Sequence, residues 1–199
     1  TSERPHPIYR TFEEAWIAFG SGGPLIEFVY LLSNNQTLTA RLQYQIDALI
    51  KEKVSDDWLE LLQLVCYAGR LGANVDFLTA KKEIHCSTMQ SAIQRLKDEY
   101  LIRVIDENKI EALHPVRAQI VFDTICLQTG TTAKDIVFKT VPCVETKNIR
   151  VILMDYFSHQ PCNLDDLHQL SQCEFTDWIG YASVIKTMLW LDAKRYVDC

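Results

Sequence analysis

Residues 101–116 read LIRVIDENKIEALHPV. Two apolar, β-branched runs flank the polar tip Asp106-Glu107-Asn108-Lys109, and this pattern predicts an antiparallel hairpin. The dipeptide His114-Pro115 follows at once. Proline is favoured at the first position of a helix because it lacks the N–H that would go unbonded there. The stretch therefore predicts two short strands joined directly to a helix.

Three helical segments are predicted before this hairpin. The first has apolar residues at helical spacing and ends near Gly69 and Gly72, which suit a left-handed cap. A short apolar segment follows at 75–84, and Ser87 is expected to N-cap the next helix. Residues 57–125 are thus predicted to form a helix, a short helix, a second long helix, a hairpin and a closing helix. This order is the winged-helix pattern. The inward face of the helix after Ser87 is expected to hold Met89, Ala92, Ile93, Leu96 and Tyr100.

The segment before the winged helix, residues 1–52, is expected to form a small helical bundle. Thr11 can cap a first helix, and Gly20-Ser21-Gly22-Gly23 is a flexible stop. Pro24 then opens a helix that is apolar on almost every side, as in a buried helix. Thr37 caps a third helix with one apolar stripe, made of Leu38, Leu42, Ile46, Leu49 and Ile50.

The winged-helix domain is expected at 53–128, and residues 129–199 are expected to form a helical arm. Antiparallel helices of this size suggest the start of an α-solenoid, but no convincing internal repeat is found, so a plain bundle stays open. The fold class is therefore mainly α, with one small β-hairpin. The arm is expected to begin with a helix or strand at 133–140 and a helix at 144–157, which has one apolar face made of Ile149, Ile152, Leu153, Tyr156 and Phe157. A short helix capped by Asn163 is expected next. The last helix is capped by Thr176 and has Trp178, Ala182, Ile185 and Leu189 on one stripe.

The composition argues against several classes of function. The chain has 20 basic and 26 acidic residues and a formal charge of −6, so it is not an obvious binder of nucleic acid or of acidic membranes. No apolar run is long enough to span a membrane, and no signal peptide opens the chain. Seven cysteines without a Cys-x-x-Cys pair suit reduced thiols in a cytosolic protein, and no Cys and His residues have zinc-site spacing. We expect a cytoplasmic protein without a metal centre.

His114 is the residue with the clearest functional potential. It stands between a strand and a helix N-terminus, where free N–H groups and the helix dipole favour an anion. An imidazole there can donate a hydrogen bond to a phosphate. It can equally cap the helix or pack under the hairpin, and physical chemistry alone favours that second interpretation.

The sequence contains no complete machinery for nucleotide hydrolysis. A P-loop needs a lysine followed by Ser or Thr after its glycines, whereas Pro24 and Leu25 follow Gly22-Gly23. No nucleophile with an evident base beside it is found, which excludes enzymatic chemistry only weakly because such partners need not be near in sequence. We therefore name no catalytic residue, and whether the chain is an enzyme stays open.

Two motifs stand on either side of this predicted architecture. Gly22-Gly23-Pro24-Leu25 opens a buried helix, and the winged helix that follows the bundle ends in Leu113-His114-Pro115-Val116. In this order, the motifs and elements resemble the regulatory half of a STAND ATPase. These proteins are signal-transducing ATPases with numerous domains, related to NB-ARC proteins. The match covers roughly residues 8–127, and its lid is similar to those of antiviral STAND proteins of prokaryotes. This chain has Pro115 where the family motif has an aspartate, which leaves the role of that acid without a counterpart here.

The resemblance implies a nucleotide-binding role for two residues. Pro24 would lie against the adenine, and His114 would reach the β-phosphate of bound ADP. ATP or ADP would bind only together with a P-loop domain of the same parent, expected before Thr1, because this chain looks like a fragment of a larger protein. The implied mechanism is a switch: exchange of ADP for ATP frees the winged helix to rotate, and the parent oligomerises.

Two other function classes remain open. A DNA-binding transcription regulator would place the helix after Ser87 in the major groove. Against it, residues 57–127 hold eight basic and ten acidic residues, a net charge of −2, and the hairpin tip is acidic. The third interpretation is a purely structural adaptor, such as the winged-helix scaffolds of proteasome-type assemblies.

Overall fold

The computed structural model divides the chain into two compact units, residues 1–53 and 54–199. In the first unit it describes helices α1 (Phe12–Phe19) and α3 (Leu38–Lys51). The predicted caps are confirmed, because the hydroxyl of Thr11 accepts from the N–H of Glu14 and that of Thr37 accepts from the N–H of Ala40, both at 3.1 Å. The glycine stop at 20–23 and the helix from Pro24 lie outside the described residues, which are 11–19, 37–52, 54–159, 161–175 and 177–197.

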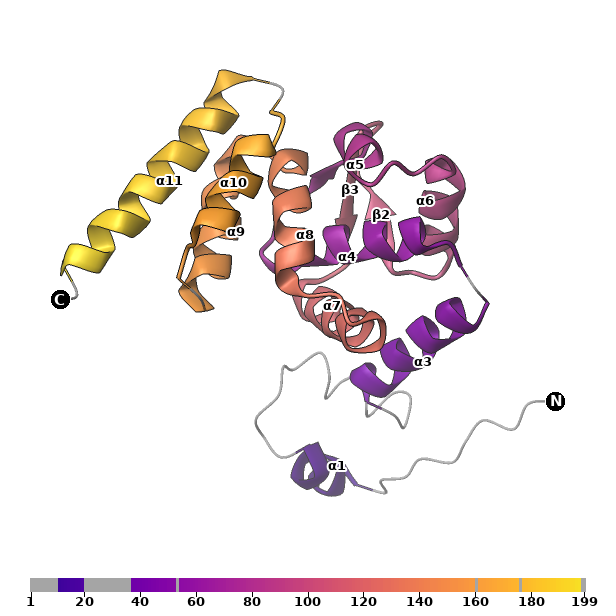
Figure 1. The fold of residues 1–199 in the computed structure, drawn as a ribbon. Helices are drawn as coiled ribbons and strands as arrows, with labels where there is room; N and C mark the ends of the chain where they lie inside the picture. The colour runs from indigo at the N-terminus through magenta and orange to yellow at the C-terminus, as the bar shows by residue number, and fades with distance from the viewer. Residues whose placement is uncertain (1–10, 20–36, 53, 160, 176, 198–199) are drawn as a thin grey trace. The chain divides into compact units, whose positions relative to one another are not determined.

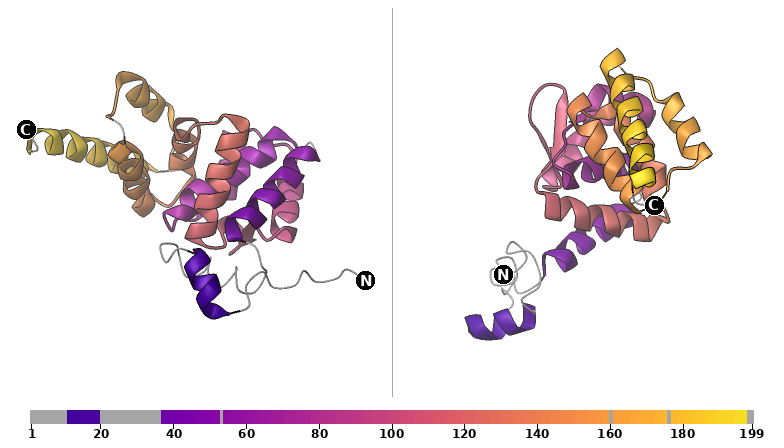
Figure 2. Two further views of the ribbon diagram at one scale, coloured as in Figure 1. Left: turned by 90° about the horizontal axis from the view of Figure 1, so that it is seen from below. Right: turned by 90° about the vertical axis from the view of Figure 1, so that its left-hand side faces the viewer.

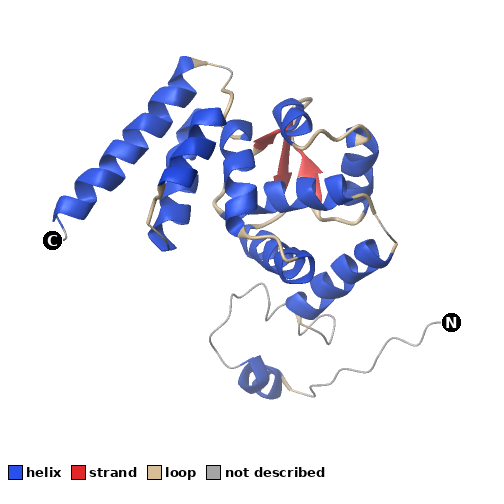
Figure 3. Ribbon diagram, in the orientation of Figure 1, coloured by secondary structure: helices blue, strands red, loops and turns tan. Residues whose placement is uncertain are grey.

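The second unit begins with a complete winged helix (Figure 1). Its sheet has three antiparallel strands in the order β1-β3-β2, with Val75 opposite Ile110 and Arg103 opposite Glu111. Figure 3 shows this small sheet among helices, so the prediction of a mainly helical fold with a hairpin is confirmed. The elements are α4 (Asp56–Arg70), β1 (Val75–Asp76), α5 (Phe77–Glu83), α6 (Met89–Asp98), β2 (Ile102–Val104), β3 (Lys109–Ala112) and α7 (Pro115–Thr129).

Helix α4 is the centre of this unit. Every residue from Leu61 to Gly69 is buried, and α4 packs against β3, α7 and α8 (Ala133–Thr140). Gly69 lies inside the helix rather than at its cap, and a Cβ there would come within 2.6 Å of the Cβ of Ala112. Glycine therefore lets α4 approach the sheet closely. Gly72 fulfils the predicted left-handed turn, with φ of +74°.

Three local predictions around α6 are wrong. Val75–Asp76 forms a strand where only an apolar segment was expected. The N-cap of α6 is Thr88 rather than Ser87, and its hydroxyl accepts from the indole N–H of Trp58 at 2.9 Å instead of capping the helix. Tyr100 is 72% exposed rather than inward, because its φ of +54° turns the chain out of the helix.

The arm continues from the winged helix without a break between units. The alternative left open at 133–140 is settled as helix α8, which a capping box of Thr132 and Asp135 begins. A short 3₁₀ turn, η1 (Val141–Cys143), leads to α9 (Thr146–His159), and Val144 bridges to Val75 of β1. The apolar face predicted for α9 is confirmed as buried: Ile149, Ile152, Leu153, Tyr156 and Phe157.

Two helices end the arm, α10 (Leu164–Gln172) and α11 (Trp178–Val197), seen from two more sides in Figure 2. Asn163 caps α10 as predicted, through the N–H of Asp166 at 3.0 Å. Thr176, the predicted cap of the last helix, lies outside the described residues. The stripe predicted on α11 is not the side that the helix buries, because α11 packs on α9 and the residues it buries are Gly180, Val184 and Thr187.

No helix among the described residues is both long enough and apolar enough to cross a membrane.

Candidate functional site

His114 lies at the junction that the sequence predicted, between β3 and α7. Its backbone is extended, with φ of −162° and ψ of 139°, and Pro115 takes the first helical position. The ring Nδ1 accepts a hydrogen bond from the N–H of Val116 at 3.1 Å. The capping role that physical chemistry favoured is therefore present. Because Nδ1 is the acceptor, the proton of a neutral ring is on Nε2.

The outer nitrogen of His114 is available to a ligand. The ring is half-buried, and within the described segments no hydrogen bond to Nε2 is found. An Nε2–H donor thus stands at the start of a 15-residue helix, whose dipole also favours negative charge. Capping and anion binding are therefore compatible, since the two ring nitrogens serve different partners.

Arg117, three residues after His114 in the first turn of α7, makes a contact that sequence reasoning missed. Its Nη2 donates to the carbonyl oxygen of Tyr100 at 2.8 Å and so ties the first turn of α7 to the chain reversal between α6 and β2. The signal in the sequence was its position, three residues after His114 and so on the same side of the helix. Pro24, the other predicted contact for nucleotide, lies outside the described residues.

A hollow of about 420 Å³ lies between α5, the base of β3 and the start of α9. Lys82 and Lys109 line it together with Asp76 and Glu145. Lys109 donates to Glu145 at 2.8 Å, and Lys147 lies 2.6 Å from the other oxygen of that carboxylate. These two lysines lower the pKa of Glu145 to about 2. The hollow is therefore balanced in charge and does not favour an anion.

The cysteines that the structure describes are free thiols. Burial raises the pKa of Cys66 and Cys143 well above the ordinary range and that of Cys173 to about 12. Such a thiol carries almost no thiolate at neutral pH and is a poor nucleophile. Nowhere in the described part of the chain do three or more His, Cys, Asp or Glu side chains gather to hold a metal ion.

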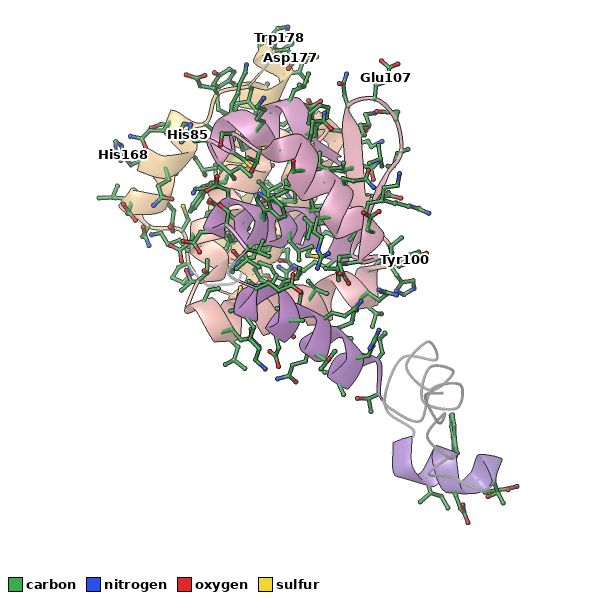
Figure 4. The ribbon with its side chains drawn as sticks, turned by 90° about the vertical axis from the view of Figure 1, so that its right-hand side faces the viewer. His85, Tyr100, Glu107, His168, Asp177 and Trp178 are labelled. Carbon is green, nitrogen blue, oxygen red and sulfur yellow. The ribbon has the colours of Figure 1, made fainter. Side chains whose placement is uncertain are left out.

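The surface that a DNA-binding winged helix would use is weakly charged. Gln90, Gln94, Lys97 and Asp98 are exposed on α6, and Gln94 donates to the carboxylate of Asp98 at 2.7 Å. Figure 4 shows Glu107 at the tip of the β2–β3 hairpin. Acidic groups at the tip and on the helix oppose contact with phosphates.

We therefore expect no tight complex of this chain with DNA, because the acidic groups of α6 and the hairpin repel the backbone. A mobility-shift assay with mixed-sequence duplexes at low salt measures this. The matched control replaces Asp106 and Glu107 by Asn and Gln, which should weaken the repulsion and increase only salt-sensitive retention. A complex of the native chain that persists as salt is raised would contradict the expectation and support a DNA-binding regulator.

The chain matches no known family model, no curated protein and no solved structure.

Proposed function

We propose that this chain is the regulatory lid and winged-helix part of a STAND-class ATPase. Residues 1–52 act as the lid, Pro24 contacts the adenine, and His114 contacts the β-phosphate of ADP in the resting state. A P-loop domain of the same parent protein supplies the rest of the nucleotide-binding site and the groups that hydrolyse ATP. The parent oligomerises on nucleotide exchange, is cytoplasmic, and belongs with the antiviral members of the class.

The observation that supports this proposal best is the hydrogen bonding of the His114 ring, in which only Nδ1 is used within the helix. The N–H of Val116 occupies Nδ1, so the donor Nε2–H remains for a ligand beside the positive end of α7. A phosphate oxygen that accepts a hydrogen bond from this N–H is charged. A hydrogen bond to a charged group contributes roughly 1.5–3 kcal/mol. Because about 1.4 kcal/mol corresponds to a factor of ten, losing this one contact is enough to shift the switch.

The direction of the switch follows from the state that His114 contacts. If Nε2–H meets only the β-phosphate of ADP in the closed form, the bond stabilises that form alone. A nucleotide that moves the winged helix away loses the contact and raises the population of the open form. Rotation of the winged helix as a rigid body is then favoured by the dense packing around α4.

In the full-length parent, His114→Ala should weaken ADP retention about tenfold or more and raise basal activity, because the closed form loses a contact that the open form never had. The measurement is the nucleotide content and oligomeric state of the purified protein. In the 199-residue chain alone, His114→Ala should leave nucleotide binding unchanged, since the P-loop domain that completes the site is not part of this chain.

His114→Asn separates the two roles of the ring. The carboxamide oxygen of asparagine keeps an acceptor for the N–H of Val116. Its NH2 group is also a donor, but it lies closer to the backbone than Nε2 and does not reach the position of that nitrogen, so ADP retention should fall as in the alanine variant while the helix cap is kept. His168→Ala removes an exposed imidazole of α10 and serves as the matched control. Equal ADP occupancy in all three variants and the native protein would leave His114 as a capping residue and overturn the proposal.

A further inference from the structure

An apolar groove of about 650 Å³ lies between α10 and α11. Leu167 and Leu170 line it from α10, and Tyr181, Ile185 and Leu189 line it from α11. The exposed fractions are 43% for Leu167, 60% for Ile185 and 66% for Leu189, so the groove is open to solvent along its length. An exposed apolar surface with polar groups at its border marks a site where another molecule packs.

The connection between α10 and α11 closes one end of this groove and is held in place by its own contacts. Phe175 lines the groove and packs edge-on against Tyr181, with ring centroids 4.9 Å apart. The backbone N–H of Phe175 donates to the hydroxyl oxygen of Tyr181 at 3.4 Å. A Cβ on Gly180 would lie 2.6 Å from the ring of Phe175, so glycine lets the connection approach α11 closely. This end of the groove is therefore formed before any partner binds.

The closed end of the groove is acidic and aromatic. Glu174 and Asp177 are exposed, and Trp178 is 75% exposed. Figure 4 shows Asp177 and Trp178 together at the start of α11. One carboxylate oxygen of Asp177 accepts from the N–H of Gly180 at 3.0 Å, but neither acid forms an ion pair with another described residue. Residues 171–181 contain no Lys, Arg or His. We call Glu174, Asp177 and Trp178 the acidic tip.

The basic residues of α11 stand away from the acidic tip. Lys186 comes five positions after Tyr181, which places it about 140° around the helix from that groove-lining residue. Lys194 and Arg195, together with Asp192, belong to the far end of α11, about 24 Å along the helix from Trp178. Exposed charges farther apart than about 8 Å are largely screened at physiological ionic strength. The acidic tip therefore keeps its negative charge uncompensated.

We propose that the groove binds a basic amphipathic helix of a partner protein, whose apolar face fills the groove and whose lysine or arginine side chains meet the acidic tip. The two carboxylates accept charge-assisted hydrogen bonds from such cations, and the exposed ring of Trp178 offers its face to them. The lining from Tyr181 to Leu191 extends about 15 Å along α11, which is nearly three turns of a partner helix. Apolar side chains at intervals of three and four residues on that helix would enter the groove.

The charge of the acidic tip selects this occupant. An acidic helix would meet like charges there, and an uncharged apolar ligand would not use the tip at all. The site goes beyond the proposed nucleotide switch and is independent of it, because no residue of the groove or the acidic tip is assigned to nucleotide. Either proposal can therefore fail without the other.

Two matched peptides test the charge selection. Both are helices of about 14 residues, roughly 20 Å long, with leucines at helical spacing, and their polar face carries lysine in one peptide and glutamate in the other. In fluorescence anisotropy at low salt, the native chain should bind the lysine peptide at least about tenfold more tightly, and the difference should shrink as salt is raised. Equal affinity for both peptides would overturn the proposal, because it would mean apolar binding without charge selection.

A pair of double variants tests whether the acidic tip is the source of this selection. Glu174→Gln with Asp177→Asn should weaken binding of the lysine peptide about fivefold or more, and asparagine keeps the cap of α11. The matched control, Asp106→Asn with Glu107→Gln, removes the same charge from the β2–β3 hairpin and should change the affinity less than about twofold. Equal losses in the two double variants would show a general attraction to an acidic chain and would overturn the proposal.

Ile185→Gln tests the groove itself, because it replaces an exposed apolar wall by a polar side chain without adding charge. It should weaken binding of the lysine peptide about tenfold, whereas Leu127→Gln, at a side chain that is 83% exposed on α7, should bind as the native chain does. Both variants should keep the native melting temperature. An unchanged affinity of Ile185→Gln would overturn the proposal. A peptide-free native chain that sediments above 22.9 kDa, and returns to that mass with Ile185→Gln, would assign the groove to a second copy and overturn it as well.

Discussion

Leu96→Ala should lower the free energy of unfolding by about 2–5 kcal/mol. Leu96 is 1% exposed on α6, the helix that packs against α4 and β2. Removing three buried carbons loses their transfer free energy and leaves a cavity that a tightly packed core refills only in part. The effect is expected to be large because α6 packs on α4 and the sheet through few buried side chains. Besides Leu96, these are Met89, Ala92 and Ile93.

Urea unfolding of the native chain and the variant measures this difference. Leu127→Ala is the control, because its side chain is exposed and its loss should change stability by no more than about 0.5 kcal/mol. Equal midpoints for Leu96→Ala and the native chain would show that α6 does not contribute to the core in the way described.

Asp155→Ala should destabilise the chain by roughly 2–4 kcal/mol, a little less than the roughly 3–5 kcal/mol lost when a fully buried pair is broken. Asp155 of α9 forms an ion pair with Arg70 at the end of α4, and the two side chains are 23% and 17% exposed. The Arg70 guanidinium also lies 4.2 Å from the ring centroid of Tyr67 and 5.5 Å from that of Phe122. Without the carboxylate, a half-buried cation keeps its desolvation cost and loses its counter-charge.

Other contacts of Arg70 extend this network but do not replace the carboxylate. Its Nη1 donates to the side-chain oxygen of Gln119 at 3.1 Å, and the hydroxyl of Tyr67 donates to Asp155 at 3.3 Å. Burial raises the pKa of Tyr67, so its hydroxyl remains a donor at neutral pH. Helices α4, α7 and α9 therefore meet at one cation, which joins the arm to the winged helix.

The control for Asp155 is a carboxylate in an exposed pair. Asp165 pairs with Lys134, and its side chain is 63% exposed, so Asp165→Ala should leave the melting temperature close to that of the native chain. Thermal unfolding followed by circular dichroism compares the two variants with the native chain. Similar melting temperatures for Asp155→Ala and Asp165→Ala would mean that the Arg70 network contributes no more than a surface ion pair.

The sequence by itself determined the elements whose signals are local. The polar tip between two β-branched runs predicted the hairpin, and Pro115 predicted both the start of α7 and the place of His114. Caps at Thr37 and Asn163 and the buried face of α9 followed from the same kind of evidence. A side chain bonded to a backbone N–H two or three residues away, or a periodic apolar face, depends on neighbours that the sequence itself supplies.

Tertiary structure decided everything that depends on a distant partner. Val75–Asp76 is a strand because β3 pairs with it, and two residues carry no period of their own. Both sides of α11 are apolar, so only its packing on α9 selects the buried side and leaves Trp178 and Ile185 exposed.

The candidate site divides in the same way. Pro115 located His114 at a helix start, but its ring hydrogen bond to Val116 assigned the Nε2 proton, because the orientation of an imidazole depends on the fold around it. Arg70 and Asp155 are 85 positions apart, and no local pattern in a single sequence joins two charges at that separation. Their pairing exists only because α4 and α9 pack into one core.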